Sequence, residues 1–452
     1  MNEKHLLTED GVLKTLLRFS LPFLAANIIQ ALYGAVDLWV IGRYCPPASV
    51  AAVSTGTQVT QIITSMVSGL TLGGTILVGR YTGLRDEAGL KKAIGTTLAL
   101  FSLIALALTA FFLMLTDPIL TALKTPAAAF ALAGEYVRVC AWGIFFICGY
   151  NAISAILRGY GDSARPMLFV GLACLLNIVC DIVFVKYFDL GVRGVALATI
   201  LAQAVSMFCA VFWLNRGRFV FRFTPSNIRI DLAKAKELAI VGVPISLQEC
   251  MVRLSFLYLT AMVNGLGVNA SAAVGVASKY DVFAMLPATS VASALAAFTA
   301  QNYGAGKPER AKTALWAGLG FAFSISACFF LWAQLSPASM IGLFATEAEI
   351  IEAGIPFFRS CSYDYLAVAF VFCLNGYLNG RGQTGFTMIS CCFGALCLRM
   401  PLIWLACRLW PENLLAIGAV APLVSGVMAV YTLIFVRRRL RRDGAGSGDR
   451  KN

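Results

Sequence analysis

Long apolar segments separated by short polar stretches run through almost the whole chain. Each segment reaches or exceeds the roughly 20 residues that an α-helix needs to cross the hydrocarbon core of a bilayer. The predicted spans lie near residues 17–42, 53–79, 93–116, 130–157, 166–188, 194–214, 238–264, 271–300, 313–336, 353–378, 385–408 and 414–436. This pattern predicts an all-α membrane protein with twelve transmembrane helices, and the even number places both termini on one side.

Composition supports a surface that faces lipid. Hydrophobic residues make up 59% of the 452 residues and charged residues only 13%, whereas an ordinary soluble domain has roughly 25% charged residues. The mean hydropathy is +0.78. A water-soluble protein of this length would need a larger polar surface, so the composition excludes that class.

Lysine and arginine are unevenly divided between the two predicted sides of the membrane. Of the 36 such residues, 26 fall on the side that holds the termini, and 5 fall on the opposite side. Basic loops stay in the cytoplasm, so both termini are expected to be cytoplasmic. The formal net charge of +13 is therefore an orientation signal, and no nucleic-acid partner is expected. Short loops favour a prokaryotic plasma membrane.

The two halves of the chain repeat each other at an offset of 221 residues. The loop GLRDEAGLKKA matches GAGKPERAKTA, and LRGYGD matches LNGRGQ. Six spans per half make this a parallel repeat, an arrangement typical of transporters that bind substrate between their halves. The expected division is an N-terminal lobe at 1–214, a cytoplasmic linker at 215–237, a C-terminal lobe at 238–436 and a disordered basic tail at 437–452.

The sequence contains few of the residue patterns that enzymes commonly use for catalysis. The single histidine, His5, lies near the N-terminus, and the fourteen cysteines contain no C-x-x-C pair. This excludes histidine-based metal clusters and serine–histidine catalysis within the spans. We expect a non-enzyme without a cofactor, apart from a coupling ion.

Two acids inside predicted spans form the strongest candidate site. Asn177 and Asp181 are four residues apart, so they share one helix face, and Thr199 on the next span adds an oxygen. If Asp37 faces them, the group suits a hard cation such as Na⁺ or a shared proton equally well. The alternative is two separate acids, each bonded to nearby hydroxyls.

Other intramembrane charges leave two interpretations open. Glu249 precedes Arg253 by one helical turn, which favours a neutral structural pair, although a cation or substrate site is also possible. Asp364 is either such a site or the partner of Arg399. Asp281 has the weakest case for a function, since Lys279 is too close in sequence to face it.

Four motifs resemble the multidrug and toxic compound extrusion (MATE) family over essentially the whole chain. They are PFLAANIIQALYGAVDLWVIGR at 22–43, GYGD at 159–162, LLNIVCDIVFV at 175–185 and GVRGVALAT at 191–199. The resemblance implies a monomeric antiporter that exports amphipathic, often cationic compounds in exchange for H⁺ or Na⁺. It also implies that Asp37, Asn177, Asp181 and Thr199 form the ion site. A flippase of lipid-linked saccharides, a membrane-embedded enzyme and a channel are the alternatives.

Pro22 is a candidate hinge in the first span. Proline removes a backbone hydrogen bond and weakens the helix locally. We hypothesise that binding of a proton or Na⁺ at Asp37 changes the shape of this span, against the alternative of a static kink.

Overall fold

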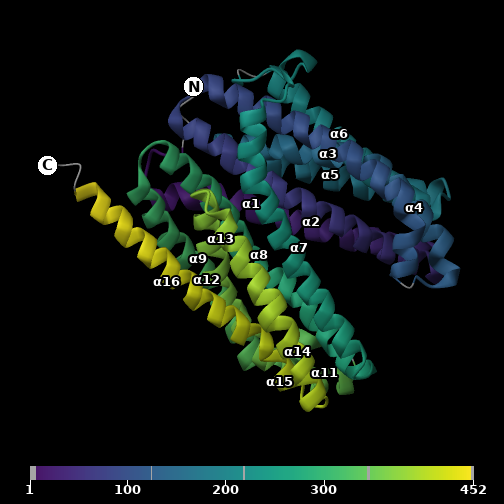
Figure 1. The fold of residues 1–452 in the computed structure, drawn as a ribbon. Coiled ribbons are helices and arrows are strands. Elements are labelled where there is room, and N and C mark those ends of the chain that lie inside the picture. The colour runs from purple at the N-terminus through teal and green to yellow at the C-terminus, as the bar shows by residue number, and fades with distance from the viewer. Residues whose placement is uncertain (1–6, 124, 217–218, 344–346, 449–452) are drawn as a thin grey trace. The chain divides into compact units, whose positions relative to one another are not determined.

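The computed structural model describes residues 7–123, 125–216, 219–343 and 347–448, and all regular structure in these ranges is helical (Figure 1). Twelve helical stretches are long and apolar enough to span a membrane. The predicted all-α class and the number of spans are therefore confirmed.

The first half of the chain contains six long helices. They are α1 (Val12–Tyr44), α2 (Pro47–Leu84), α3 (Glu87–Ala122), α4 (Ala127–Tyr160), α5 (Ala164–Ile182) and α6 (Gly191–Arg216). A π-helical turn, Val183–Tyr187, extends α5. Local chemistry sets several boundaries: Pro47 begins α2, where its missing N–H costs nothing, and the Asp86 side chain caps α3 by accepting from Gly89 N at 2.9 Å.

The second half also contains six spans, some of them built from more than one helical element, together with short helices in the connections. These elements are η3 (Pro225–Asn227), α7 (Leu232–Asn264), α8 (Val268–Gly304), α9 (Pro308–Leu335), α10 (Pro337–Gly342), α11 (Ala348–Cys361), α12 (Tyr363–Gly380), α13 (Thr384–Phe393), the π-helix Gly394–Arg399, α14 (Met400–Leu409), α15 (Leu414–Gly418) and α16 (Val420–Gly448). The short 3-10 turn η3 lies in the connection before α7, and α10 follows α9 directly.

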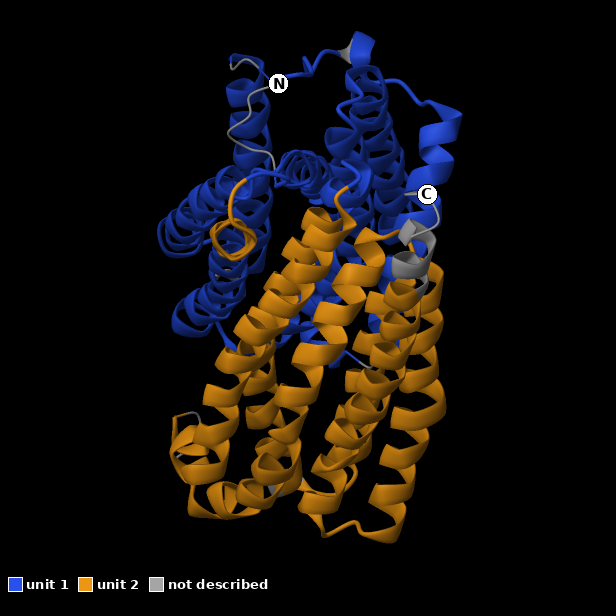
Figure 2. Cartoon of the chain, turned by 90° about the vertical axis from the view of Figure 1, so that its left-hand side faces the viewer, with its two compact units in different colours: residues 1–9, 21–246, 300–306 blue, residues 10–20, 247–299, 307–452 orange. Residues whose placement is uncertain are grey.

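The chain forms two compact units, each with its own apolar core (Figure 2). Unit 1 comprises residues 1–9, 21–246 and 300–306, and unit 2 comprises 10–20, 247–299 and 307–452. Val53, Ile94 and Ile144 belong to the core of unit 1, while Phe358 and Ile403 belong to that of unit 2. Three of the unit boundaries lie inside the helices α1, α7 and α8, and the other two lie before α1 and between α8 and α9.

The linker and the tail differ from their expected bounds. Helix α7 begins at Leu232, inside the expected linker, because Asp231 caps it by accepting from Ala233 N at 3.0 Å and Lys234 N at 3.1 Å. The tail expected to be disordered is helical as far as Gly448. Arginine is a good helix former, which favours continuation of the helix through residues 437–442.

The sequence repeat has a counterpart in backbone conformation. Gly161 and its repeat partner Gly382 both have positive φ, at 102° and 81°, and end their helices. Arg85 and its partner Gly306 also share the left-handed region, at 57° and 69°. The turns after equivalent helices are therefore built alike in the two halves.

Equivalent glycines also let equivalent helices approach closely. A Cβ on Gly159 would lie 2.6 Å from Thr75 O, and a Cβ on Gly380 would lie 2.5 Å from Ala296 O. The two contacts are related by the same repeat offset. Each one lies within a single unit, so each unit uses glycine to bring two backbones together.

Alanine at either glycine is expected to destabilise the protein. Gly159→Ala and Gly380→Ala must each displace a neighbouring backbone, at a cost of about 1–3 kcal/mol, which should lower the Tm measured in detergent. Gly320→Ala is the matched control, because nothing lies within 4 Å of its Cβ position. An unchanged Tm in the first two variants would contradict the close approach.

Candidate functional site in unit 1

The structure brings together three of the four residues predicted to form the ion site. Asp37 lies on α1, and Asn177 and Asp181 lie on successive turns of α5. Their exposed fractions are 3%, 0% and 0%, so the group lies wholly inside the helices of unit 1. The four-residue spacing aims both α5 side chains at the face where Asp37 approaches.

The amide of Asn177 bridges the two carboxyl groups. With its nitrogen facing them, Nδ2 lies 3.1 Å from Asp37 Oδ1 and 3.3 Å from Asp181 Oδ2. The two carboxyl groups also lie within hydrogen-bonding reach of each other. The second carboxylate oxygen of Asp181, Oδ1, is buried and has no partner among the described residues.

Thr199 is buried on α6 but makes its hydrogen bond within its own helix. Its hydroxyl donates to Val195 O at 3.0 Å, and no hydrogen bond between described residues joins it to the three others. Its oxygen can still accept or coordinate through its lone pairs. The prediction that it belongs to the site remains a prediction.

The arrangement needs a neutralising partner. Two carboxylates in a buried site repel each other and lose their hydration, so the site is favourable only when it holds a proton or a cation. The orphaned Asp181 oxygen and the facing Asp37 carboxylate are the hard oxygen donors that Na⁺ takes. The Asn177 nitrogen, in the orientation described, suits a proton shared by the carboxyl groups.

Unit 2 places a second polar group around a cavity of about 20 Å³. Asp281, Asp364 and Arg399 line it from three different spans. The hydroxyl of Tyr365 donates to Asp281 Oδ1 at 3.0 Å, and Arg399 Nη2 lies 3.3 Å from Ser425 Oγ. Sequence reasoning linked Asp364 with Arg399 but gave Asp281 the weakest case, because Lys279 is too close in sequence to face it. Neither spacing nor motif relates α8 to α12, so nothing in the sequence indicated that Asp281 lies beside Asp364.

Glu249 stands apart from its predicted partner. Its charge and that of Arg253 interact, but no ion pair of 4.0 Å or less joins them among the described residues. Glu249 instead lies near Cys391, whose sulfur accepts from Asn375 Nδ2 at 3.4 Å. The structure does not bring Glu249 to the cavity lined by Asp364.

Pro22 lies inside the continuous helix α1. The boundary between the units in this helix falls between Ser20 and Leu21, and the boundary in α7 falls two residues after Pro244. A proline therefore stands next to each of these two boundaries.

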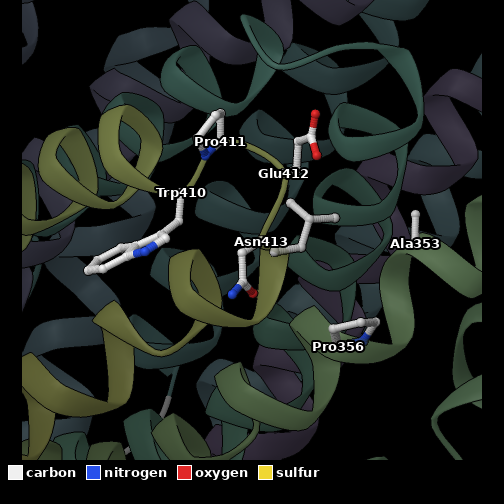
Figure 3. Close-up of a pocket in the computed structure, with 7 residues that line it drawn as sticks. Ala353, Pro356, Trp410, Pro411, Glu412 and Asn413 are labelled. Atoms are coloured by element: carbon white, nitrogen blue, oxygen red, sulfur yellow. The ribbon is translucent and has the colours of Figure 1, made fainter.

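A larger opening of about 520 Å³ in unit 2 is a weak candidate site. It lies between α11 and the connection from α14 to α15, and Trp410, Glu412 and Asn413 line it. Figure 3 shows these three side chains pointing in different directions. Since specific ligand sites need converging polar groups, this opening carries no functional assignment.

Comparison with known proteins identifies the family. The MatE family model matches this chain twice, at residues 22–183 and 244–405. The chain belongs to the MatE family. The two matches correspond to the two halves of the internal repeat, and both Asp37 and the α5 pair fall within the first match. As a member of this family, the chain is a multi-pass membrane transporter and not an enzyme.

Its relatives cover most of its length. The "Probable multidrug resistance protein YpnP" of Bacillus subtilis is 26% identical, over 83% of this chain and 84% of the relative. The "Multidrug export protein MepA" of Staphylococcus aureus is 24% identical over 86% of both. A "FAD transporter" of Shewanella oneidensis is 24% identical over 83% of this chain and 85% of the relative.

Solved structures of MatE-type transporters share the fold. "MATE in the bent conformation" superposes with a TM-score of 0.92, at 24% identity over 98% of both chains. "MATE in the straight conformation" has a TM-score of 0.88, at 25% identity over 96% of this chain and 98% of that one.

The contact between the two carboxyl groups predicts non-additive stability. Asp37→Asn and Asp181→Asn, measured singly and together, should give a coupling energy of at least about 0.5 kcal/mol in a double-mutant cycle. Each carboxyl group is a neighbour of the other, so replacing one changes the effect of replacing the second. The measurement is denaturant unfolding in detergent. Asp37→Asn combined with Asp117→Asn is the control, since Asp117 is exposed and paired with Arg138. Additivity in the first cycle would show that the carboxyl groups are separate.

Proposed function

We propose that this transporter exports amphipathic, often cationic compounds in exchange for H⁺ or Na⁺. The observation that carries the proposal is the buried group formed by Asp37, Asn177 and Asp181. Membership of the MatE family and the names of the multidrug relatives support the class of exported compound. The proposed mechanism is alternating access of the two halves of the repeat.

Coupling follows from the charge of the unit 1 site. Without a bound proton or cation the site holds uncompensated negative charge in an apolar interior, which raises its free energy. Binding of one cation or proton relieves that cost and favours whichever conformation encloses the site. Exchange results if the exported compound favours the other conformation, because each ligand then lowers the affinity for the other.

Helix α1 is the proposed mechanical link. It carries both Asp37 and Pro22, and a helix bends most readily at proline. The resemblance to structures named for bent and straight conformations supports a change in shape. We propose that Asp37 and Asp181 hold α1 and α5 in one arrangement when the site is occupied, and that α1 bends near Pro22 when it empties.

Two further candidate sites belong to this proposal. Thr199 completes the unit 1 site by turning its oxygen toward a bound Na⁺. Glu249 and Asp364 are two separate alternative locations in unit 2, Glu249 for an ion or substrate and Asp364, which is 3% exposed, for a proton or substrate.

The relative named as a FAD transporter provides a second candidate cargo. It favours an anionic, aromatic compound over a cationic one. The same export assay distinguishes the two, because a flavin nucleotide and an organic cation are both fluorescent and can be loaded separately. Export of lipid-linked saccharides is the remaining alternative and becomes the next assay if neither compound moves.

Transport should depend on the unit 1 acids. Efflux of a fluorescent organic cation from energised vesicles, under separately imposed Na⁺ and pH gradients, should respond to one of the two gradients. Asp37→Asn should abolish the gradient-driven part, since the neutral amide cannot exchange a proton and lacks the charge that compensates a bound cation. Asp117→Asn is the matched control, being an exposed acid outside the site. Full gradient-driven efflux by Asp37→Asn would move the coupling site to Glu249 or Asp364.

We also propose a plasma-membrane location for a monomer with both termini in the cytoplasm and annular lipid as its surroundings. The excess of lysine and arginine on one side supports this orientation. A fluorescent protein fused after Asn452 should fold and fluoresce, whereas alkaline phosphatase at the same position should stay inactive. An inactive fluorescent protein together with an active alkaline phosphatase would show that the C-terminus lies outside the cytoplasm.

A further inference from the structure

The cavity between Asp281, Asp364 and Arg399 is a built polar site inside unit 2. Asp364 is 3% exposed, and its Oδ1 has no hydrogen-bond partner among the described residues. The volume of about 20 Å³ exceeds the 10–15 Å³ that one water molecule requires. Size therefore admits one water molecule or one small ion, and the charges around the cavity decide between them.

Three charged side chains line the cavity. Asp281, Asp364 and Arg399 share one cavity and are close enough for their charges to act on one another, although no ion pair of 4.0 Å or less joins Arg399 to either acid among the described residues. With both carboxyl groups ionised the cavity carries one net negative charge, and with one of them protonated it is neutral. Without Arg399 the same cavity would hold two uncompensated carboxylates, which is the condition that recruits a metal cation.

Arg399 is held in place by residues of two helices. Its Nη1 lies 3.5 Å from Ser255 Oγ on α7, and its Nη2 lies 3.3 Å from Ser425 Oγ on α16. The guanidinium also lies over the ring of Phe256, 5.1 Å from its centroid. Asp364 lies near the same serine, so the Ser425 hydroxyl stands close to both the cation and the buried carboxylate.

The local helix geometry accounts for the position of Arg399. Pro401 has no N–H to donate to Cys397 O, and its ring crowds that carbonyl. The chain widens into the π-helix Gly394–Arg399 immediately before it, as helices do where a functional side chain must be re-aimed. Arg399 is the last residue of this turn.

We propose that Arg399 serves as the built-in cation of the Asp281–Asp364 cavity and excludes Na⁺ from it. A tethered guanidinium is always present at the site and pays no entropy of association, unlike a free ion. A second cation entering the cavity would meet the guanidinium at short range in a medium of low dielectric constant. The acids of unit 2 therefore do not fit a free metal ion in this chain.

The test uses purified full-length protein carrying Asp37→Asn and Asp181→Asn, which removes the acids of unit 1. Thermal unfolding is compared in NaCl and in N-methyl-D-glucamine chloride of equal concentration. With Arg399 intact, the Tm should be the same in both salts. When Arg399→Met is added, the Tm in NaCl should exceed the Tm in N-methyl-D-glucamine chloride by about 2–4 °C, because the cavity without its guanidinium then binds Na⁺. Adding Asp364→Asn as well should abolish this difference.

Two control substitutions separate the charge of Arg399 from its size. Arg399→Lys keeps a tethered cation and should show no Na⁺ dependence. Arg408→Met removes an exposed arginine of α14 and should also show none. A folded Arg399→Met variant without a Na⁺-dependent shift would overturn the proposal.

Asp364→Asn in the same background, with Arg399 intact, decides the question if Arg399→Met fails to fold. The proposal expects equilibrium binding of ²²Na⁺ to be unchanged by this substitution. A loss of bound ²²Na⁺ would show that Asp364 already holds the ion beside Arg399. Because every variant lacks the unit 1 acids, failure of the antiport proposal leaves this test unaffected.

Discussion

Ionisable side chains inside an apolar interior impose the constraint on which the rest of this structure depends. An unpaired charge at the centre of a membrane span costs about 2.5–3.5 kcal/mol on insertion scales. Such a residue persists only when another charge, a hydrogen bond or a bound ion compensates it. Asp37 and Asp181 in unit 1, and Asp281 and Asp364 in unit 2, each face this requirement.

The two units meet the requirement in different ways. Unit 1 places the Asn177 amide against its acids, and no lysine or arginine among the described residues acts on the two carboxyl groups. Unit 2 supplies Arg399 from within the chain. A site without a fixed cation can exchange a mobile one, whereas a site with a fixed cation is already compensated. The proposed coupling role of unit 1 and the proposed closed cavity of unit 2 follow from this difference.

The polar group of unit 1 and that of unit 2 lie near equivalent positions of the sequence repeat. At an offset of 221, Asp281 corresponds to Thr60 and Cys361 to Cys140. Cys140 lies near both Thr60 and Asp37, while Cys361 lines the unit 2 cavity with Asp281. Duplication therefore preserved the backbone, including the glycine contacts and the turns with positive φ, and the polar side chains diverged within it.

The sequence by itself determined the properties that depend on local pattern. Span length and the 221-residue repeat predicted twelve helices in two related halves, and the four-residue spacing of Asn177 and Asp181 placed them on one helix face. Only the tertiary structure decided which side chains meet: that Asp37 faces the α5 pair, that Asp281 lines one cavity with Asp364 and Arg399, and that Glu249 and Arg253 form no ion pair of 4.0 Å or less among the described residues. The physical reason is that periodicity reports the face on which a side chain lies, whereas its partner depends on how separate helices pack.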